Sequence, residues 1–135
     1  MDQDKHALIP GWNDVLSWFE GHSSFHDAEI LELHLDRMGK SYIRIHWWII
    51  RPELDARGYY IMDKHAIVTL HLSGISDLDL LAFNFQNVIF GLQIQPTDEG
   101  LKLSLDPCHG LAGTITAKEI TAEVAPGKPT PPVMP

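Results

Sequence analysis

The chain of 135 residues has a single cysteine, Cys108, and few basic residues. One cysteine allows no internal disulfide, so packing must stabilise the fold, and a reducing compartment is the simpler expectation. The 10 Lys and Arg stand against 18 Asp and Glu, which leaves a net charge of −8. Binding to a phosphate backbone requires clustered Lys and Arg, so this charge argues against nucleic acid as a partner. It also disfavours anionic membranes and favours basic proteins.

Long apolar runs and targeting signals are missing as well. The longest apolar run, residues 45–50, is interrupted by His46 and is far shorter than the ~20 residues that span a bilayer. The N-terminus, residues 1–6, is polar and acidic, whereas a secretory signal has a basic start followed by an apolar stretch. We therefore expect a cytoplasmic protein with no membrane partner.

With 44% hydrophobic residues the chain can bury one core, and residues 1–125 are expected to form a single globular domain. Five of the nine prolines follow this region: Pro126, Pro129, Pro131, Pro132 and Pro135. Residues 126–135 are therefore predicted to form an extended, polyproline-like tail.

Apolar residues at helical spacing follow Gly11: Trp12, Val15, Leu16 and Phe19. They predict a short helix, with Asn13 or Asp14 as its N-cap and Gly21 just beyond its end. From Ala28 onward the pattern alternates with a period of two, which is typical of strands. Expected strands cover residues 28–36, 41–50, 65–72, 75–85, 88–95, 101–106 and 114–124. Residues 51–64 are predicted to be a partly packed flap or a broken edge strand, and Ser73–Gly74 to be a turn.

No second helix is long enough for a crossover between parallel strands. The predicted fold class is therefore mainly β (α+β). We expect a curved antiparallel sheet or an open sandwich of about 6–8 strands, with one short N-terminal helix packed on it. In the first hairpin, the register that places Leu35 opposite Ile43 keeps one face apolar, and it pairs Glu32 with His46.

Eight histidines are an unusual number for this length, so a metal site has to be considered. Three fall on polar strand faces and could bind zinc if adjacent strands brought them together: His34, His46 and His71. Paired half-exposed histidines explain the pattern equally well, because no HExxH or CxxC spacing occurs. No glycine pattern typical of nucleotide binding occurs either, so no cofactor is expected.

Two short pairs could support nucleophilic catalysis. His26–Asp27 could form a general base beside Ser23, Ser24 or Cys108. Cys108 also precedes His109, although sequence neighbours rarely adopt the geometry of a thiolate–imidazole pair. A loop-closing role for the first pair and a packing role for Cys108 are the simpler interpretations.

The segment Asn84-Phe85-Gln86-Asn87 interrupts the strand pattern with three amides. It predicts a bulge or tight corner whose backbone groups the amides satisfy, with a recognition surface as the alternative. Elsewhere, aromatic residues at outward positions predict a protein-binding surface: Tyr42, Trp48, Tyr59 and Tyr60. Glu32 and Asp36 would lie at its rim.

Three segments of the chain carry a family resemblance: residues 25–30 (Phe-His-Asp-Ala-Glu-Ile), residues 84–92, and residues 110–113 together with Ile115. Taken together, they resemble the immunity protein 50 family of bacterial polymorphic toxin systems over roughly residues 10–124. Members of that family are small, mostly β proteins with a tryptophan-containing N-terminal helix. Four residues match family motif positions whose role is unknown: His26, Asp27, Glu29 and Asn87.

The resemblance implies a non-enzymatic, cytosolic antidote that binds and neutralises a cognate toxin, and it transfers no catalytic residue. Many such toxins are basic nucleases, to which an acidic inhibitor would be attracted. Two alternatives stay open. One is a metal-dependent hydrolase or isomerase that uses the strand histidines, and the other is a structural or oligomerising β domain. The oligomeric state does not follow from the sequence.

Overall fold

The computed structural model describes residues 8–130, which consist of one short helix followed by six strands. The helix α2 covers Trp12–Trp18. The strands are β1 Glu29–His34, β2 Ser41–Leu54, β3 Tyr60–Leu81, β4 Val88–Thr97, β5 Gly100–His109 and β6 Ala112–Pro126. All pairings between them are antiparallel. The predicted mainly β fold with one short N-terminal helix is confirmed.

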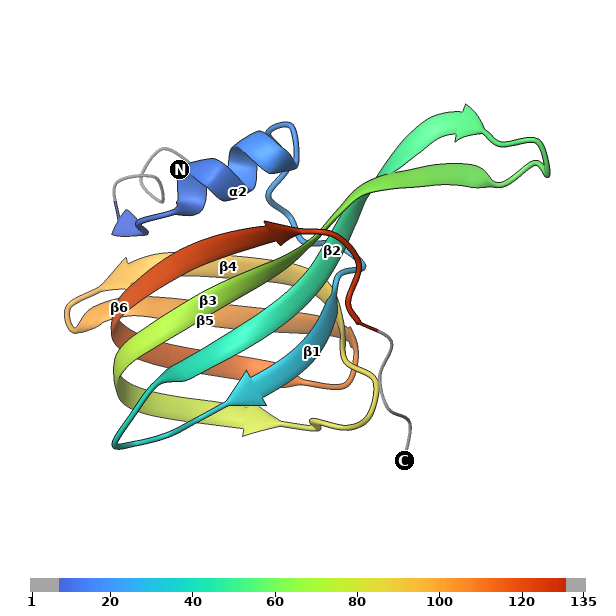
Figure 1. The fold of residues 1–135 in the computed structure, drawn as a ribbon. Helices are drawn as coiled ribbons and strands as arrows, with labels where there is room; N and C mark the ends of the chain where they lie inside the picture. The colour runs from blue at the N-terminus through green and yellow to red at the C-terminus, as the bar shows by residue number, and fades with distance from the viewer. Residues whose placement is uncertain (1–7, 131–135) are drawn as a thin grey trace.

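The six strands form a closed barrel in the order β1-β2-β3-β6-β5-β4 (Figure 1). The closing ladder between β1 and β4 is short, with Glu29 opposite Val88. A backbone hydrogen bond of 2.8 Å from Ile30 N–H to the Asn87 carbonyl adds to it. The predicted curved sheet therefore bends far enough to meet itself, so no open sandwich forms.

β3 is one strand of 22 residues where the sequence predicts two strands separated by a turn. Gly74 has a φ of +67°, a left-handed conformation that glycine adopts at little cost. The ladder with β6 then accommodates an extra residue of β3 between Ile75 and Asp77. The predicted turn at Ser73–Gly74 is wrong, because β6 pairs with β3 on both sides of Gly74, and the bulge that follows it bends the strand without reversing it.

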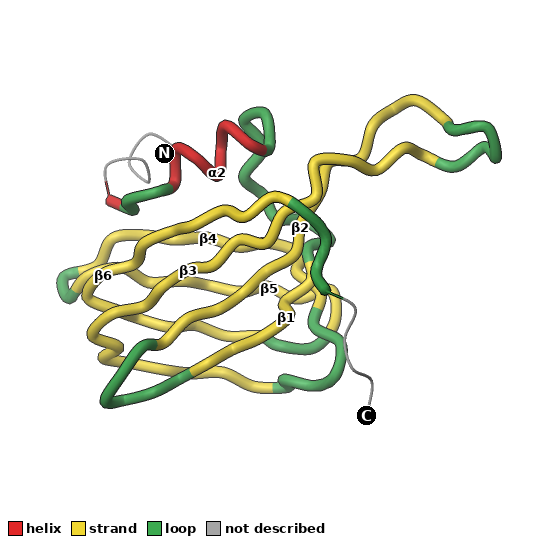
Figure 2. Tube along the Cα trace, in the orientation of Figure 1, coloured by secondary structure: helices red, strands yellow, loops and turns green. Residues whose placement is uncertain are grey.

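Residues 51–64 are part of a hairpin. β2 continues to Leu54 and β3 begins at Tyr60, so the two strands project beyond the barrel as a ribbon (Figures 1 and 2). At its tip, Asp55 Oδ1 accepts hydrogen bonds from the backbone N–H of Arg57 (2.8 Å) and Tyr59 (3.0 Å). We call residues 50–64 the arm.

The predicted register of the first hairpin, with Leu35 opposite Ile43 and Glu32 opposite His46, is wrong. The structure pairs Leu33 with Ile43, Glu32 with Arg44, and His34 with Tyr42. The register is shifted by two residues, because β1 ends at His34 and residues 35–40 form a longer turn than predicted, so Leu33 still lies on the same face as Ile43. A separate bulge between Ile30 and Glu32 adds one residue to β1.

The extended tail predicted for residues 126–135 starts later in the structure than the sequence predicts. Pro126 belongs to β6, opposite Ala66, and Gly127 N–H donates a 2.8 Å hydrogen bond to the His65 carbonyl. Pro131, Pro132 and Pro135 lie outside the described residues. Proline ends the ladder here because it has no N–H to donate.

Helix α2 begins after Gly11, and not at a cap formed by Asn13 or Asp14. Gly11 has a φ of +90°, and a Cβ on it would lie 1.8 Å from the Ala122 carbonyl oxygen of β6. Only glycine lets the start of the helix approach β6 this closely. No helix within residues 8–130 is long and apolar enough to cross a bilayer.

Aromatic rings from α2, the following loop and β2 form the core beneath the helix. The fully buried Phe25 stacks on Trp47, with ring centroids 4.7 Å apart and planes 25° apart. Phe19 also lies 4.7 Å from Trp47. As the alternation predicts, Trp47 points inward, whereas Trp48 points outward and is only partly buried.

Candidate functional site

The outward side chains of β1, β2 and β3 form a surface rich in rings. Since neighbouring strands align His34, Tyr42 and His71, these residues form one row across the barrel. Tyr42 stacks on His34 with centroids 5.0 Å apart, and its ring lies 6.3 Å from that of His71. We call the following nine residues the aromatic face: Glu32, His34, Tyr42, Arg44, His46, Trp48, His65, His71 and Glu123.

Glu32 fixes the centre of the aromatic face. Its carboxylate accepts hydrogen bonds from Tyr42 Oη (3.1 Å) and from Arg44 Nη1 (3.2 Å). The hydrogen bond to Glu32 raises the pKa of Tyr42, so the phenol stays protonated. One further contact orders the edge of the face, because His71 Nε2 lies 2.9 Å from Glu123 Oε1. The Tyr42 ring is therefore presented in one fixed orientation.

A second group of rings lies at the base of the arm. His46 Nε2 and His65 Nδ1 are 3.0 Å apart, and the Trp48 ring lies 4.8 Å from that of His46. Burial, together with repulsion from His65 and Lys128, lowers the pKa of His46 to about 4. Burial and Lys128 also lower the pKa of His65. Both imidazoles are consequently neutral at pH 7 and share one hydrogen bond.

The His46 environment should make the protein sensitive to acid. A histidine with a lowered native pKa is protonated first in the unfolded chain, so stability is complete above about pH 6.5 and falls as the pH drops toward 4. We expect His46→Gln to lose less stability than the wild type over this interval, as measured by urea denaturation at a series of pH values. His34→Gln, on the same face, is the matched control and should retain the wild-type acid loss. Parallel curves for wild type and His46→Gln would contradict the assignment.

The three histidines considered as zinc ligands do not converge. His34 and His71 lie on either side of Tyr42, and His46 instead contacts His65. Within residues 8–130 there is no group of three or more His, Cys, Asp or Glu side chains that could hold a metal ion. The rival hypothesis of a hydrolase or isomerase built on these histidines therefore has no geometric support.

A groove adjoins the aromatic face where the turn between β1 and β2 meets the Gly74 bend. It has a volume of about 740 Å³, and its lining includes Asp36, Lys40, His71, Ile75, Leu78 and Glu119. Asp36 is held in the turn, where its Oδ1 accepts a 2.9 Å hydrogen bond from Met38 N–H. Leu78 is 44% exposed. The groove thus combines apolar walls with charges of both signs.

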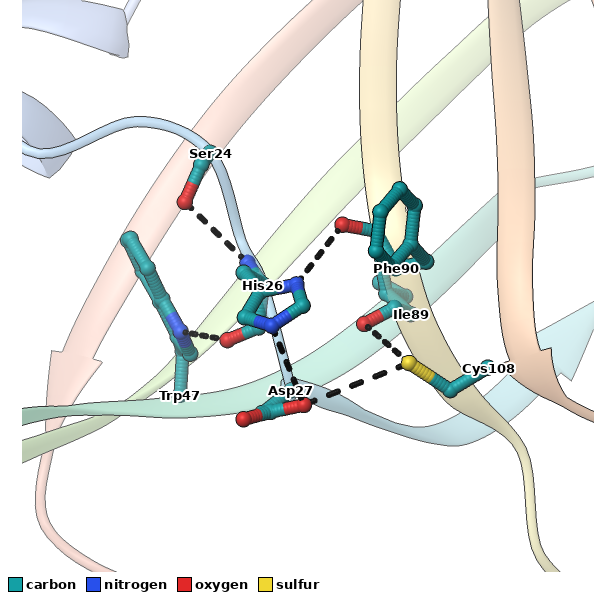
Figure 3. Close-up of polar contacts among 7 residues, drawn as sticks. All are labelled: Ser24, His26, Asp27, Trp47, Ile89, Phe90 and Cys108. Atoms are coloured by element: carbon teal, nitrogen blue, oxygen red, sulfur yellow. Dashed lines mark hydrogen bonds and ion pairs between the residues drawn. The ribbon is translucent and has the colours of Figure 1, made fainter.

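Cys108 lies beside the His26–Asp27 pair, but the three groups do not form a catalytic arrangement (Figure 3). Asp27 Oδ1 lies 3.5 Å from His26 Nε2 and 4.0 Å from Cys108 Sγ, so the carboxylate oxygen is shared between the thiol and the imidazole. Cys108 Sγ also lies 3.7 Å from the Ile89 carbonyl oxygen. A thiolate nucleophile needs the imidazole at the sulfur itself, whereas these two contacts are ones that a protonated thiol donates.

The segment around His26 has a structural task. Phe25 and Asp27 both adopt left-handed φ angles, +57° and +67°, which turn the chain sharply into β1. The loop is tied to both neighbouring strands, because the His26 carbonyl accepts a 2.9 Å hydrogen bond from Trp47 Nε1 and His26 Nδ1 lies 3.0 Å from the Phe90 carbonyl oxygen. These bonds support the bent backbone, whose left-handed residues would otherwise be costly.

The amides of residues 84–87 satisfy backbone groups, as the sequence predicts. Asn87 is 2% exposed, and its Oδ1 accepts hydrogen bonds from Asn84 N–H (3.1 Å) and Leu111 N–H (2.9 Å). Its Nδ2 donates a 2.7 Å hydrogen bond to the Asn84 carbonyl. The corner therefore fastens the β3–β4 loop to the segment that precedes β6. In the same loop Phe85 is 95% exposed.

The four predicted aromatic anchors lie in two places. Tyr42 and Trp48 belong to the aromatic face, whereas Tyr59 and Tyr60 lie on the arm and are 67% and 62% exposed. Glu29 lies opposite His46 at the edge of the face. The sequence does not reveal that these four residues lie on two separate surfaces.

Two features of this region were not predicted. One is His65 as the partner of His46, which depends on the register between β2 and β3. The other is the clamp at the base of the arm: Arg51 donates to both carboxylate oxygens of Glu20 at 2.9 Å and to Asp63 at 2.8 Å. In the sequence, the only indication of this clamp is that Arg51 lies in a stretch that also contains acidic residues. These contacts hold the Arg51 pKa above its ordinary value, so the guanidinium stays charged.

No family model, no curated protein and no solved structure matches this chain.

Proposed function

We propose that this chain is a non-enzymatic immunity-type protein, which binds a cognate bacterial toxin in the cytoplasm and neutralises it by occlusion. The observation that carries the proposal is the ordered aromatic face, where Tyr42 is held between His34 and His71 and hydrogen-bonded to Glu32. Aromatic side chains in fixed orientations make effective binding hot spots, because little side-chain entropy is lost when a partner binds.

Charge supports a basic partner. The chain carries a net charge of −8, and Glu32 and Glu123 lie on the aromatic face itself beside a single arginine, Arg44. The groove next to Tyr42 gives room for a side chain of the partner. The resemblance of residues 25–30 and 84–92 to immunity proteins suggests that this partner is a toxin. Opposite charges on the two proteins would accelerate their association.

The test is an inhibition assay with the purified product of a toxin gene that neighbours the gene for this chain. Excess wild-type protein should abolish the toxin's activity. Tyr42→Ala should weaken binding by about 2 kcal/mol, roughly thirtyfold in Kd, measured by calorimetry. Phe85→Ala removes an equally large exposed ring far from the face and serves as the matched control. Full toxin activity in the presence of excess wild-type protein would refute the proposal.

A further inference from the structure

The arm is a part of the described structure where strand edges are left unpaired. β1 pairs with β2 only as far as His46, and the β6 ladder reaches β3 only at Ala66. Beyond these points β2 and β3 pair only with each other (Figure 1). An exposed two-stranded ribbon is marginally stable in water, and its free edges are ready to pair with another strand.

The arm is also apolar. Six large hydrophobic side chains are exposed along it: Ile50 52%, Leu54 58%, Tyr59 67%, Tyr60 62%, Ile61 38% and Met62 54%. A patch of this kind marks an interaction site in a soluble protein. The base of the arm is rigid, because Arg51 joins it to Glu20 and Asp63, and Trp18 Nε1 donates a 2.9 Å hydrogen bond to the Lys64 carbonyl. The ribbon is therefore presented in a defined direction.

The two edges of the arm differ. On the β2 edge, Pro52 lacks an N–H, and the ladder is irregular between Ile50 and Leu54. Both features block the addition of a further strand. The β3 edge, residues 60–63, contains no proline and no glycine. It is the edge that can accept another strand.

The charge of the arm indicates what kind of partner can pair with it. Residues 50–64 contain Arg51, Arg57 and Lys64 against Glu53, Asp55 and Asp63, so the arm is neutral although the whole chain carries −8. A basic partner is thus attracted elsewhere on the molecule, while two arms can meet without repulsion. The five residues from Ile50 to Leu54 extend about 16 Å at ~3.3 Å per residue, about twice the ~8 Å over which charges act at physiological ionic strength. Arm contact therefore keeps two acidic barrels apart.

We propose that the occupant is a second copy of this chain, and that residues 60–63 of two copies pair as antiparallel strands about a two-fold axis. An antiparallel pair of identical strands is self-complementary, as a closed dimer requires. The resulting four-stranded sheet covers the exposed edge and places the apolar side chains of the two arms side by side on its faces. The aromatic face lies on the barrel and remains open, so the dimer would present two copies of it.

Sedimentation equilibrium at micromolar to hundreds of micromolar concentration tests the proposal. The wild type should reach twice the chain mass of 15.2 kDa. Met62→Lys places a charge at the pairing edge and should remain at the single-chain mass, with an unchanged circular dichroism spectrum. Phe85→Lys introduces the same charge on an exposed residue of the β3–β4 loop and should dimerise like the wild type. A wild type that stays monomeric over the whole range, or a Met62→Lys variant that still dimerises, would overturn the proposal.

Hydrogen exchange supplies a second readout. Backbone amides of residues 60–63 should become more protected as the wild-type concentration rises, because strand pairing sequesters N–H groups. Dimerisation without this protection would refute edge pairing. Toxin inhibition by Met62→Lys should equal that of the wild type, since Tyr42 is untouched. Failure of the dimer and failure of the proposed function are therefore distinguishable.

Discussion

Replacement of Trp47 by alanine should lower the free energy of unfolding by about 4 kcal/mol, whereas the same change at the adjacent Trp48 should cost less than about 1 kcal/mol. Trp47 is 6% exposed and packs against Phe25 and Phe19 at 4.7 Å. Its removal leaves a cavity beneath α2 and frees the carbonyl of His26 from its 2.9 Å hydrogen bond. Trp48 lies on the outer surface against His46, where water can replace the lost contacts.

Urea denaturation of the two variants and the wild type gives the comparison, because both changes remove the same side chain from neighbouring positions of one strand. Trp47→Phe is an informative intermediate. It keeps a ring against Phe25 but cannot donate to the His26 carbonyl, so it should lose roughly 1–2 kcal/mol. Equal losses of unfolding free energy for Trp47→Ala and Trp48→Ala would mean that the side chains of Trp47 and Trp48 do not lie on opposite faces of β2, one buried and one outward.

The alternation of β2 is where sequence reasoning worked best. A period of two with one apolar face predicts which of two adjacent tryptophans is buried, and it needs no knowledge of the strand's neighbours. The expected strands at residues 88–95 and 101–106 likewise correspond to β4 and β5, which the structure pairs as a hairpin with Ile94 opposite Leu103. Both results depend only on residues close together in the chain. The antiparallel class follows from the absence of a second helix.

Bulges explain some of the failures. Between Ile75 and Asp77, and between Ile30 and Glu32, the chain admits one extra residue, which bends the strand or reverses its faces. A glycine in a strand pattern is compatible with a turn or with a continuous strand, and only the partner strand decides between them. β6 pairs with β3 on both sides of Gly74, so the strand continues. Such long-range pairing is invisible in a local pattern.

Neither the closure of the barrel nor the arm could be predicted from the sequence, for the same reason. Barrel closure depends on how far the sheet coils, and the contact that completes it joins residues 29 and 88. The arm exists because β2 and β3 continue to pair after β1 and β6 have ended. Of the candidate site, the residue types were predictable, but the His46–His65 pair was not, because it depends on this register.

Asn87→Ala should destabilise the protein by about 3 kcal/mol, the largest effect we expect from a polar residue. The side chain is buried and makes three hydrogen bonds, to the N–H of Asn84, the N–H of Leu111 and the carbonyl of Asn84. Alanine leaves these groups without partners, and each unsatisfied buried group costs about 1–3 kcal/mol. The adjoining residue, Gly110, has no side chain that could fill the space left by the amide; a Cβ there would lie 2.4 Å from Asn87 Oδ1 in the wild type.

Two variants at the same corner separate the contributions of the individual Asn87 hydrogen bonds to stability. Gln86→Ala changes an exposed neighbour and should leave the free energy of unfolding within about 0.5 kcal/mol of the wild type. Asn87→Asp keeps the acceptor oxygen for Asn84 and Leu111 but loses the donor, so it should be less damaging than alanine. Asn87 is also one of the four residues at which the sequence resembles a family motif, and its hydrogen bonds give it a structural role that needs no part in recognition. If Asn87→Ala were as stable as the wild type yet failed to inhibit the toxin, that explanation would be wrong, and the motif would belong to the binding surface.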